Sequence, residues 1–205
     1  RLVYKAETPK TEEVTETVPP PVAPETEAPA PSSGSSDYTP ITQFMSATAT
    51  YYKLTGNGAC GYDTLLGPPS EIYGVALSEY AFQKSKKCGV CLEVTGPLGS
   101  VIVTVVDMCP AEDTWCSTTS THLDMTEPAF PSIMQKVTGV GPVTYREVEC
   151  KVTGNVKLWT EAAQTWYLKF IIFNHRVAIS RVEAKVGSST YEMTRDVWNG
   201  WELNG

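Results

Sequence analysis

The sequence predicts a mainly β protein, with two β-rich domains behind an N-terminal linker. Most apolar stretches after residue 41 are short, rich in β-branched residues and bounded by turn residues, which is typical of strands. All six cysteines lie between residues 60 and 150, which confines any disulfides to one domain. Residues 1–40 have a different composition, rich in Pro, Glu, Thr and Ser.

Residues 1–40 are predicted to form a disordered linker. Residues 11–31 are mostly Pro, Glu, Thr, Val and Ala, and a Ser/Gly run follows them. Such a segment cannot bury enough apolar surface to offset its chain entropy, and its prolines favour an extended spacer. A spacer connects two things, so we expect a further module or an anchor beyond it.

The first folded domain is predicted over residues 41–151. Two β-branched runs, 90–94 and 100–105, flank a Gly-Pro turn and predict a hairpin. A helix is predicted over residues 126–137, with Thr126 as N-cap. Its apolar face would be Phe130, Ile133, Met134 and Val137, and Pro131 is an irregularity within it. A shorter helix is predicted over residues 78–85.

The second domain is predicted over residues 152–205, as a small antiparallel β module without cysteines. Four strands are expected, at residues 156–161, 166–173, 177–186 and 190–194. Four strands with one apolar face make a thin core, so we expect this domain to be incomplete at its C-terminus.

Composition excludes several functions. The 205 residues carry 16 Lys and Arg against 23 Asp and Glu, a net charge of −7, which argues against a nucleic-acid partner. No apolar run is long enough for a membrane helix. The chain starts with Arg1 rather than Met, so we interpret it as a mature or excised fragment, compatible with secretion.

The six cysteines indicate an oxidising compartment. They allow 15 pairings, and spacing alone does not choose among them. A zinc site or a redox pair at Cys88 and Cys91 is disfavoured, because no matching second ligand pair and no βαβ context are present.

Two carboxylates stand at the ends of predicted elements. Asp107 ends an apolar strand, and Asp124 precedes the predicted helix. Acids in such positions can line a sugar-binding groove. The alternatives are that Asp124 only caps the helix and that Asp107 only forms a turn.

Five motifs, taken in order, resemble the expansin family. They are GACGY at 58–62, CGVC at 88–91, DMCP at 107–110, HLD at 122–124 and VTYREVEC at 143–150. Trp166, Tyr167, the Asn174–His175 pair and Trp198 resemble the expansin carbohydrate-binding domain. The resemblance covers about residues 45–205. It implies a six-stranded double-psi β-barrel followed by an immunoglobulin-like β-sandwich. It also implies three disulfides, Cys60–Cys88, Cys91–Cys150 and Cys109–Cys116.

The resemblance implies a secreted, extracellular protein that binds cellulose, or other matrix glucans such as xyloglucan, and loosens cell walls without hydrolysis. Asp124 corresponds to the proton donor of family 45 glycoside hydrolases, which expansins retain, and Thr50 to a groove threonine. Trp166, Tyr167 and Trp198 would bind the glucan. No metal, cofactor, nucleic acid or membrane is expected to take part, and the protein is expected to be a monomer.

The general base of the related hydrolases has no counterpart here, because residues 51–55 contain no Asp or Glu. One alternative is therefore a weak endoglucanase in which Asp107 replaces that base. Another is a binding scaffold that resembles the barwin proteins. It is suggested by Cys109, which stands where bacterial expansins have a groove tyrosine. Tyr51, Tyr52 or Trp115 would then supply the groove aromatic.

Strand periodicity restricts the aromatic pair. Within one regular strand Trp166 and Tyr167 point to opposite faces, so both can face a sugar only if Trp166 precedes the strand or a bulge re-aims it. His122 is predicted to share the side of Asp124. His175 is predicted to be a turn or packing residue rather than a catalyst. Lys169 is predicted to be a solvated lysine, with a hydrogen bond to a sugar hydroxyl as the alternative.

Overall fold

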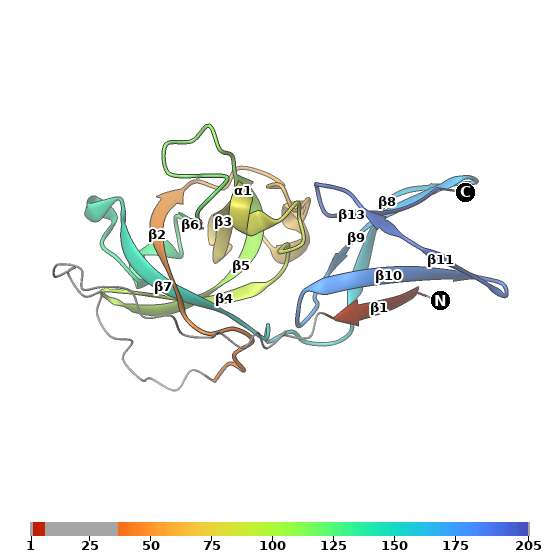
Figure 1. The fold of residues 1–205 in the computed structure, drawn as a ribbon, viewed down its shortest axis with the longest axis horizontal. Coiled ribbons are helices and arrows are strands. Elements are labelled where there is room, and N and C mark those ends of the chain that lie inside the picture. Colours follow the sequence, from red (N-terminus) through yellow and green to blue (C-terminus); the bar gives the residue numbers. More distant parts are fainter. Residues whose placement is uncertain (1, 7–36, 205) are drawn as a thin grey trace, which may run out of the picture.

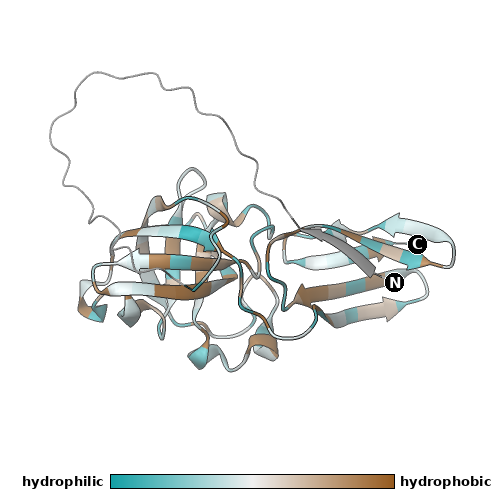
Figure 2. Ribbon diagram, turned by 90° about the horizontal axis from the view of Figure 1, so that it is seen from below, coloured by the Kyte–Doolittle hydropathy of each residue, from teal (hydrophilic) through white to brown (hydrophobic). Residues whose placement is uncertain are grey.

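The computed structural model describes residues 2–6 and 37–204, which form a β-barrel and a β-sandwich side by side (Figure 1). No helix among these residues is both long and apolar enough to span a membrane. In Figure 2, hydrophobic stretches run along the strands of both domains, as expected where strands enclose a core.

The first domain is a closed six-stranded barrel with the order β2-β6-β3-β5-β4-β7. Two strand pairs, β2 with β6 and β3 with β5, are parallel, and the other pairs are antiparallel. The strands are β2 (Met45–Tyr52), β3 (Gly74–Ser78), β4 (Cys91–Gly96), β5 (Gly99–Cys109), β6 (His122–Thr126) and β7 (Gly141–Val148). This is the predicted double-psi barrel, and the predicted hairpin is β4–β5.

The barrel is filled by alternate side chains of its strands. Val94, Val105, Leu123 and Met125 have no exposed surface, because they come from successive strands and meet in one apolar cluster. Their neighbours along the strands point outward, and this alternation places Asp124 on the outside of the barrel.

The three implied disulfides are all present, at Cys60–Cys88, Cys91–Cys150 and Cys109–Cys116. The first fastens the loop before β3 to the segment before β4. The second fastens β4 to the end of the barrel domain, and the third closes a short loop after β5.

The helix predicted over residues 126–137 is wrong. The segment contains only two 3₁₀ turns, η3 (Phe130–Ser132) and η4 (Lys136–Thr138). Pro131 has no backbone N–H and interrupts the helical hydrogen bonds. Phe130, Ile133 and Met134 are buried as expected, but Val137 is 89% exposed.

Thr126 is not a helix cap. It ends β6, and its hydroxyl donates to the carbonyl oxygen of Ile72 at 2.6 Å. The helix predicted over residues 78–85 is shorter than expected, because α1 (Glu79–Phe82) gives way to three residues with positive φ, Gln83, Lys84 and Ser85.

The second domain is a sandwich of two sheets, β12-β13-β9-β8 and β1-β10-β11. Its strands are β8 (Lys157–Gln164), β9 (Tyr167–Phe173), β10 (Ile179–Val186), β11 (Ser189–Glu192), β12 (Thr194–Arg195) and β13 (Gly200–Asn204), with β1 (Leu2–Ala6). Phe170, Ile172, Val182 and Trp201 fill the space between the sheets.

Strand β1 corrects the linker prediction for residues 2–6. These residues pair antiparallel with β10, from Leu2 opposite Ala184 to Ala6 opposite Ile179. The pairing joins segments far apart in the sequence, so local composition did not reveal it. The rest of the predicted linker, residues 7–36, lies outside the described residues.

Direct contacts join the two domains. Ile171 of β9 belongs to the apolar cluster of the barrel. The Asn199 side chain donates to the carbonyl oxygen of Cys60 at 3.1 Å, and the Ser85 hydroxyl donates to the carbonyl oxygen of Asp196 at 2.7 Å. The sandwich therefore rests on the loops that follow β2 and α1.

Candidate functional site: a barrel groove and an aromatic row

Asp124 and Thr50 face each other across the parallel pair β2–β6. They are register partners, so their side chains leave the barrel on the same side. The Thr50 hydroxyl donates to Oδ1 of Asp124 at 2.7 Å. The structure thus brings together two of the three predicted groove residues.

His122 is a buried neighbour of Thr50 and hydrogen-bonds to it. It is buried, with 1% exposure, and its Nε2 lies 2.7 Å from Thr50 Oγ1 while its Nδ1 lies 2.8 Å from Thr48 Oγ1. Because Thr50 donates to Asp124, it must accept from Nε2–H, and Thr48 then donates to Nδ1. Burial lowers the pKa of His122, so the neutral ring required by this chain is favoured.

Burial raises the pKa of Asp124 to about 6. The hydrogen bond from Thr50 opposes this shift, whereas the negative charges of Asp113 and Asp107 add to it. Asp124 is therefore protonated in mildly acidic solution and ionised at neutral pH.

Asp107 lies two strands away from Asp124 on the same face. Ala76 of β3 is the register partner of both residues, so their α-carbons are separated by two strand spacings, about 10 Å. Ala76 is 3% exposed, and its small side chain forms the floor between the two acids.

Protein donors occupy both carboxylate oxygens of Asp107. The backbone N–H groups of Ala59 and Met108 donate to Oδ1 at 2.6 and 2.8 Å, and the Tyr52 hydroxyl donates to Oδ2 at 3.1 Å. Burial and the nearby Asp107 raise the pKa of Tyr52, which keeps its proton in place. Asp107 therefore holds the turn at residues 58–60 in place, and both of its carboxylate oxygens already accept hydrogen bonds from the protein.

Trp115 is the best placed of the three aromatics predicted for the groove. Its ring stacks on that of His122 with centroids 6.3 Å apart, and it is 49% exposed. Tyr52 is committed to Asp107, and Tyr51 packs against Phe130 at 4.8 Å. Of the three aromatics considered from the sequence, Trp115 is the most exposed, and its ring stacks on His122, which shares the face of Asp124.

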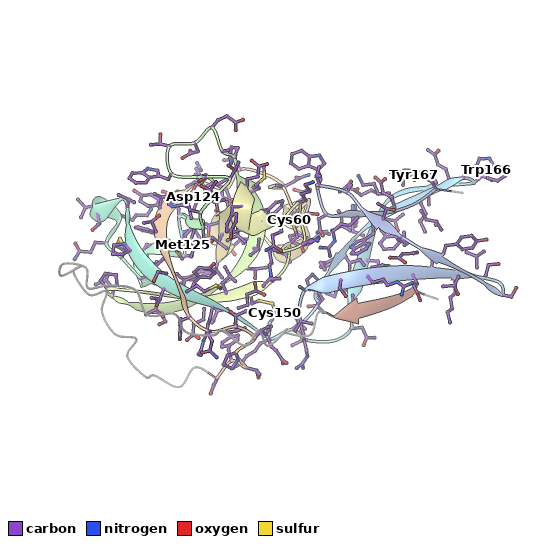
Figure 3. The ribbon with its side chains drawn as sticks, viewed as in Figure 1. Cys60, Asp124, Met125, Cys150, Trp166 and Tyr167 are labelled. Carbon is purple, nitrogen blue, oxygen red and sulfur yellow. A yellow bond between two sulfur atoms is a disulfide. The ribbon has the colours of Figure 1, made fainter. Side chains whose placement is uncertain are left out.

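On the sandwich, Trp166 precedes the regular strand. It lies in the β8–β9 turn and is 75% exposed, while Tyr167 is the first residue of β9. The periodicity requirement is thus met, because Trp166 is outside the pleat. Figure 3 shows both residues at the end of the sandwich, with Asp124 in the barrel.

Trp198 lies in the turn between β12 and β13 and is 55% exposed. Its backbone N–H donates to Oδ1 of Asp196 at 2.8 Å, which fixes the turn. We call Trp166, Tyr167 and Trp198 the aromatic row. Whether these residues bind a sugar stays a prediction.

The prediction that Lys169 is solvated is wrong. Its ammonium lies 2.7 Å from Asp196, 3.3 Å from Glu161 and 3.6 Å from Glu202. The hydrogen bond to Asp196 is the main reason why the pKa of Lys169 is raised. Lys169 is therefore a structural cation that holds three acids together.

The packing role expected for His175 is confirmed. The residue is buried, its Nδ1 lies 2.9 Å from the carbonyl oxygen of Val177, and burial lowers its pKa to about 4. Sequence reasoning missed Thr48 and Asp113. The alternation Thr48, Thr50, Tyr52 along one strand was a usable signal for Thr48, whereas Asp113 lies in a loop without periodicity.

Barrel and sandwich together define a two-domain double-psi barrel protein. The chain belongs to the expansin family, because the family model "Expansin N-terminal domain" matches residues 30–144, more than half of it.

Among curated relatives, Expansin-like protein 2 of Dictyostelium discoideum is 34% identical over 80% of this chain and 42% of its own length. Expansin-A22 of Arabidopsis thaliana is 33% identical over 65% of this chain and 53% of its own. The chain thus spans about half the length of these relatives.

Among solved structures, the expansin of Clavibacter michiganensis superposes with a TM-score of 0.67 at 28% identity, over 78% of both chains. A mutant of that expansin, crystallised in complex with cellohexaose, gives the same TM-score at 27% identity, again over 78% of both chains.

Proposed function

We propose that this chain belongs to a secreted expansin that binds cellulose or related wall glucans and loosens the wall without hydrolysing it. The supporting observation is the state of the two groove acids. Asp124 is poised to hold or release a proton, while Asp107, the carboxylate across Ala76, is engaged by three protein donors. Secretion is supported by three disulfides within one domain.

An inverting glycosidase needs an acid and a free base with a water between them. On β2, Thr50 stands opposite Asp124 and Thr48 stands opposite His122, so this strand offers hydroxyls and no carboxylate beside Asp124. A glucan in the groove can therefore accept a hydrogen bond from protonated Asp124 and stack on Trp115 without an activated water. The binding energy is then available to separate glucan chains.

The aromatic row supplies affinity. The complex of the Clavibacter relative with cellohexaose supports a glucan as ligand. Each stacked ring contributes on the order of 1 kcal/mol, by analogy with aromatic pairs. Replacing Trp166, Tyr167 and Trp198 with Ala should then weaken cellulose binding by about two decades, with little salt dependence.

The test compares wild type, the triple alanine variant and Asp124→Asn in three assays: cellulose binding, creep of cellulose paper and release of reducing sugar. Asp63→Asn, at the exposed first residue of the 3₁₀ turn η1 (Asp63–Leu66), is the matched control. We expect Asp124→Asn to bind normally and lose creep, with no sugar released by any variant.

Other outcomes separate the alternatives. Sugar release that disappears in Asp124→Asn would show a hydrolase, with Asp107 or Asp113 as base. Tight binding without creep in the wild type would show a scaffold. Unchanged binding in the triple variant would show that the row is not a sugar platform.

A further inference from the structure

Trp159 is a large exposed aromatic that neither the groove nor the aromatic row includes. It lies on β8, the edge strand of the four-stranded sheet, and 55% of its surface is exposed. A solvent-facing tryptophan on an edge strand is unusual unless a partner covers it, because such rings contribute most when buried.

A register shift turns Trp159 onto the outer face of this sheet. Trp159 pairs with Ile171, and Ala162 pairs with Lys169. Strand β8 therefore contains one residue more than β9 over this stretch, which is a β-bulge. Without this bulge, simple alternation from Ala162 would aim Trp159 into the sandwich. With it, Trp159 shares the face of Lys169 and Tyr167, and its register partner Ile171, on the same face, is buried against the barrel.

The position of Trp159 widens this face sideways. The aromatic row runs from Trp166 and Tyr167, at the far end of β9, to Trp198 in the turn before β13. Strand β8 lies on the opposite side of β9 from β13, so Trp159 is displaced from the β13 side by two strand spacings, about 10 Å. From β9, which carries Tyr167, the offset is one strand spacing, about 5 Å, so Trp159 lies beside the row on the side away from Trp198.

A polar centre lies among these four aromatics. Lys169 projects from the same face and holds Glu161 from the bulge, Asp196 from the Trp198 turn, and Glu202 from β13. Carboxylates held in this way can accept hydrogen bonds from sugar hydroxyls. The face therefore combines stacking rings with acceptors across its width as well as along its length.

We propose that Trp159 is a fourth binding residue, which converts the aromatic row into a surface for the flat face of an ordered glucan whose chains lie side by side. This inference rests on the proposed function, since it assumes that the row binds glucan. It adds that Trp159 contacts a second, neighbouring chain. Trp159 thereby favours crystalline cellulose over a single soluble chain.

The test measures binding of the 205-residue protein to crystalline cellulose and to soluble cellohexaose. Trp159→Ala should weaken binding to crystalline cellulose about fivefold and change cellohexaose affinity less than twofold. Trp166→Ala should weaken both. Tyr191→Ala is the matched control, because Tyr191 is an exposed aromatic on β11 in the other sheet, 46% exposed. It should change neither.

Equal losses on both ligands in Trp159→Ala, or no loss on either, would overturn the proposal. If Trp166→Ala also leaves both affinities unchanged, the aromatic row itself is wrong, which is a separate result. Trp159→Thr replaces one residue of high β-propensity with another, and it must reproduce the selective loss if stacking rather than strand stability is responsible.

Discussion

Asp124→Asn should change how stability depends on pH. Burial raises the pKa of Asp124 from its ordinary value of 3.8 to about 6 in the folded protein. Between these values the folded state binds more protons than the unfolded state, so stability falls as pH rises through this window and is constant above it. Asparagine cannot ionise, and it keeps an oxygen that accepts from Thr50.

The magnitude follows from the shift. About two pKa units correspond to about 3 kcal/mol as an upper limit. Asp124 is only half-buried and solvent screens part of this effect, so we expect about 1–2 kcal/mol. The free energy of unfolding of Asp124→Asn, minus that of the wild type, should rise by this amount from pH 4 to pH 7. Taking the difference cancels the titration of groups that the substitution leaves unchanged.

Urea unfolding of both proteins at pH 4, 5, 6 and 7 measures this difference. Thr50→Val is the informative companion, because removing the hydroxyl removes the hydrogen bond that lowers the pKa of Asp124. The loss of stability should then shift to higher pH. A difference that stays constant, or that falls with pH, would show that Asp124 is an ordinary exposed acid.

Two further perturbations test the sandwich. Deleting residues 1–6 leaves the β10 edge unpaired, so thermal unfolding should occur a few degrees lower and self-association should increase; an unchanged midpoint in calorimetry would show that β1 contributes nothing to stability. Lys169→Met leaves three carboxylates without their shared cation and should also lower the midpoint, with partial recovery in Lys169→Met/Glu202→Gln; equal midpoints in wild type and single variant would contradict this role.

Much of the barrel could be predicted from the sequence, because its strands carry a local signal. The β-branched runs at β4 and β5 and the turn between them are features of adjacent residues. The disulfide pairs are different, since spacing left 15 pairings open and only the resemblance selected three. The helix prediction over residues 126–137 was wrong because it relied on the apolar periodicity and gave too little weight to Pro131.

The Asp124 site and the outer face of the four-stranded sheet depend on strand register, which cannot be read from the sequence. Thr48, Thr50, His122 and Asp124 meet because β2 and β6 pair in parallel across about 70 residues. Trp159 reaches the outer face only because β8 contains one extra residue. Such a bulge moves the side chains that precede it to the opposite face of the sheet from the one that simple alternation predicts.

The domain junction links the Asp124 site of the barrel to the aromatic row of the sandwich through direct contacts. Gly89 has a positive φ, and a side chain there would collide with His175 and with the Tyr62 hydroxyl, so barrel and sandwich approach closely at a position that only glycine fits without strain. Asp196 links this junction to the aromatic row. Its backbone oxygen accepts a hydrogen bond from Ser85 of the barrel, and its carboxylate contacts both Lys169 and the backbone N–H of Trp198. The aromatic row is therefore connected to the barrel through hydrogen-bonded and packed groups as well as through the chain itself.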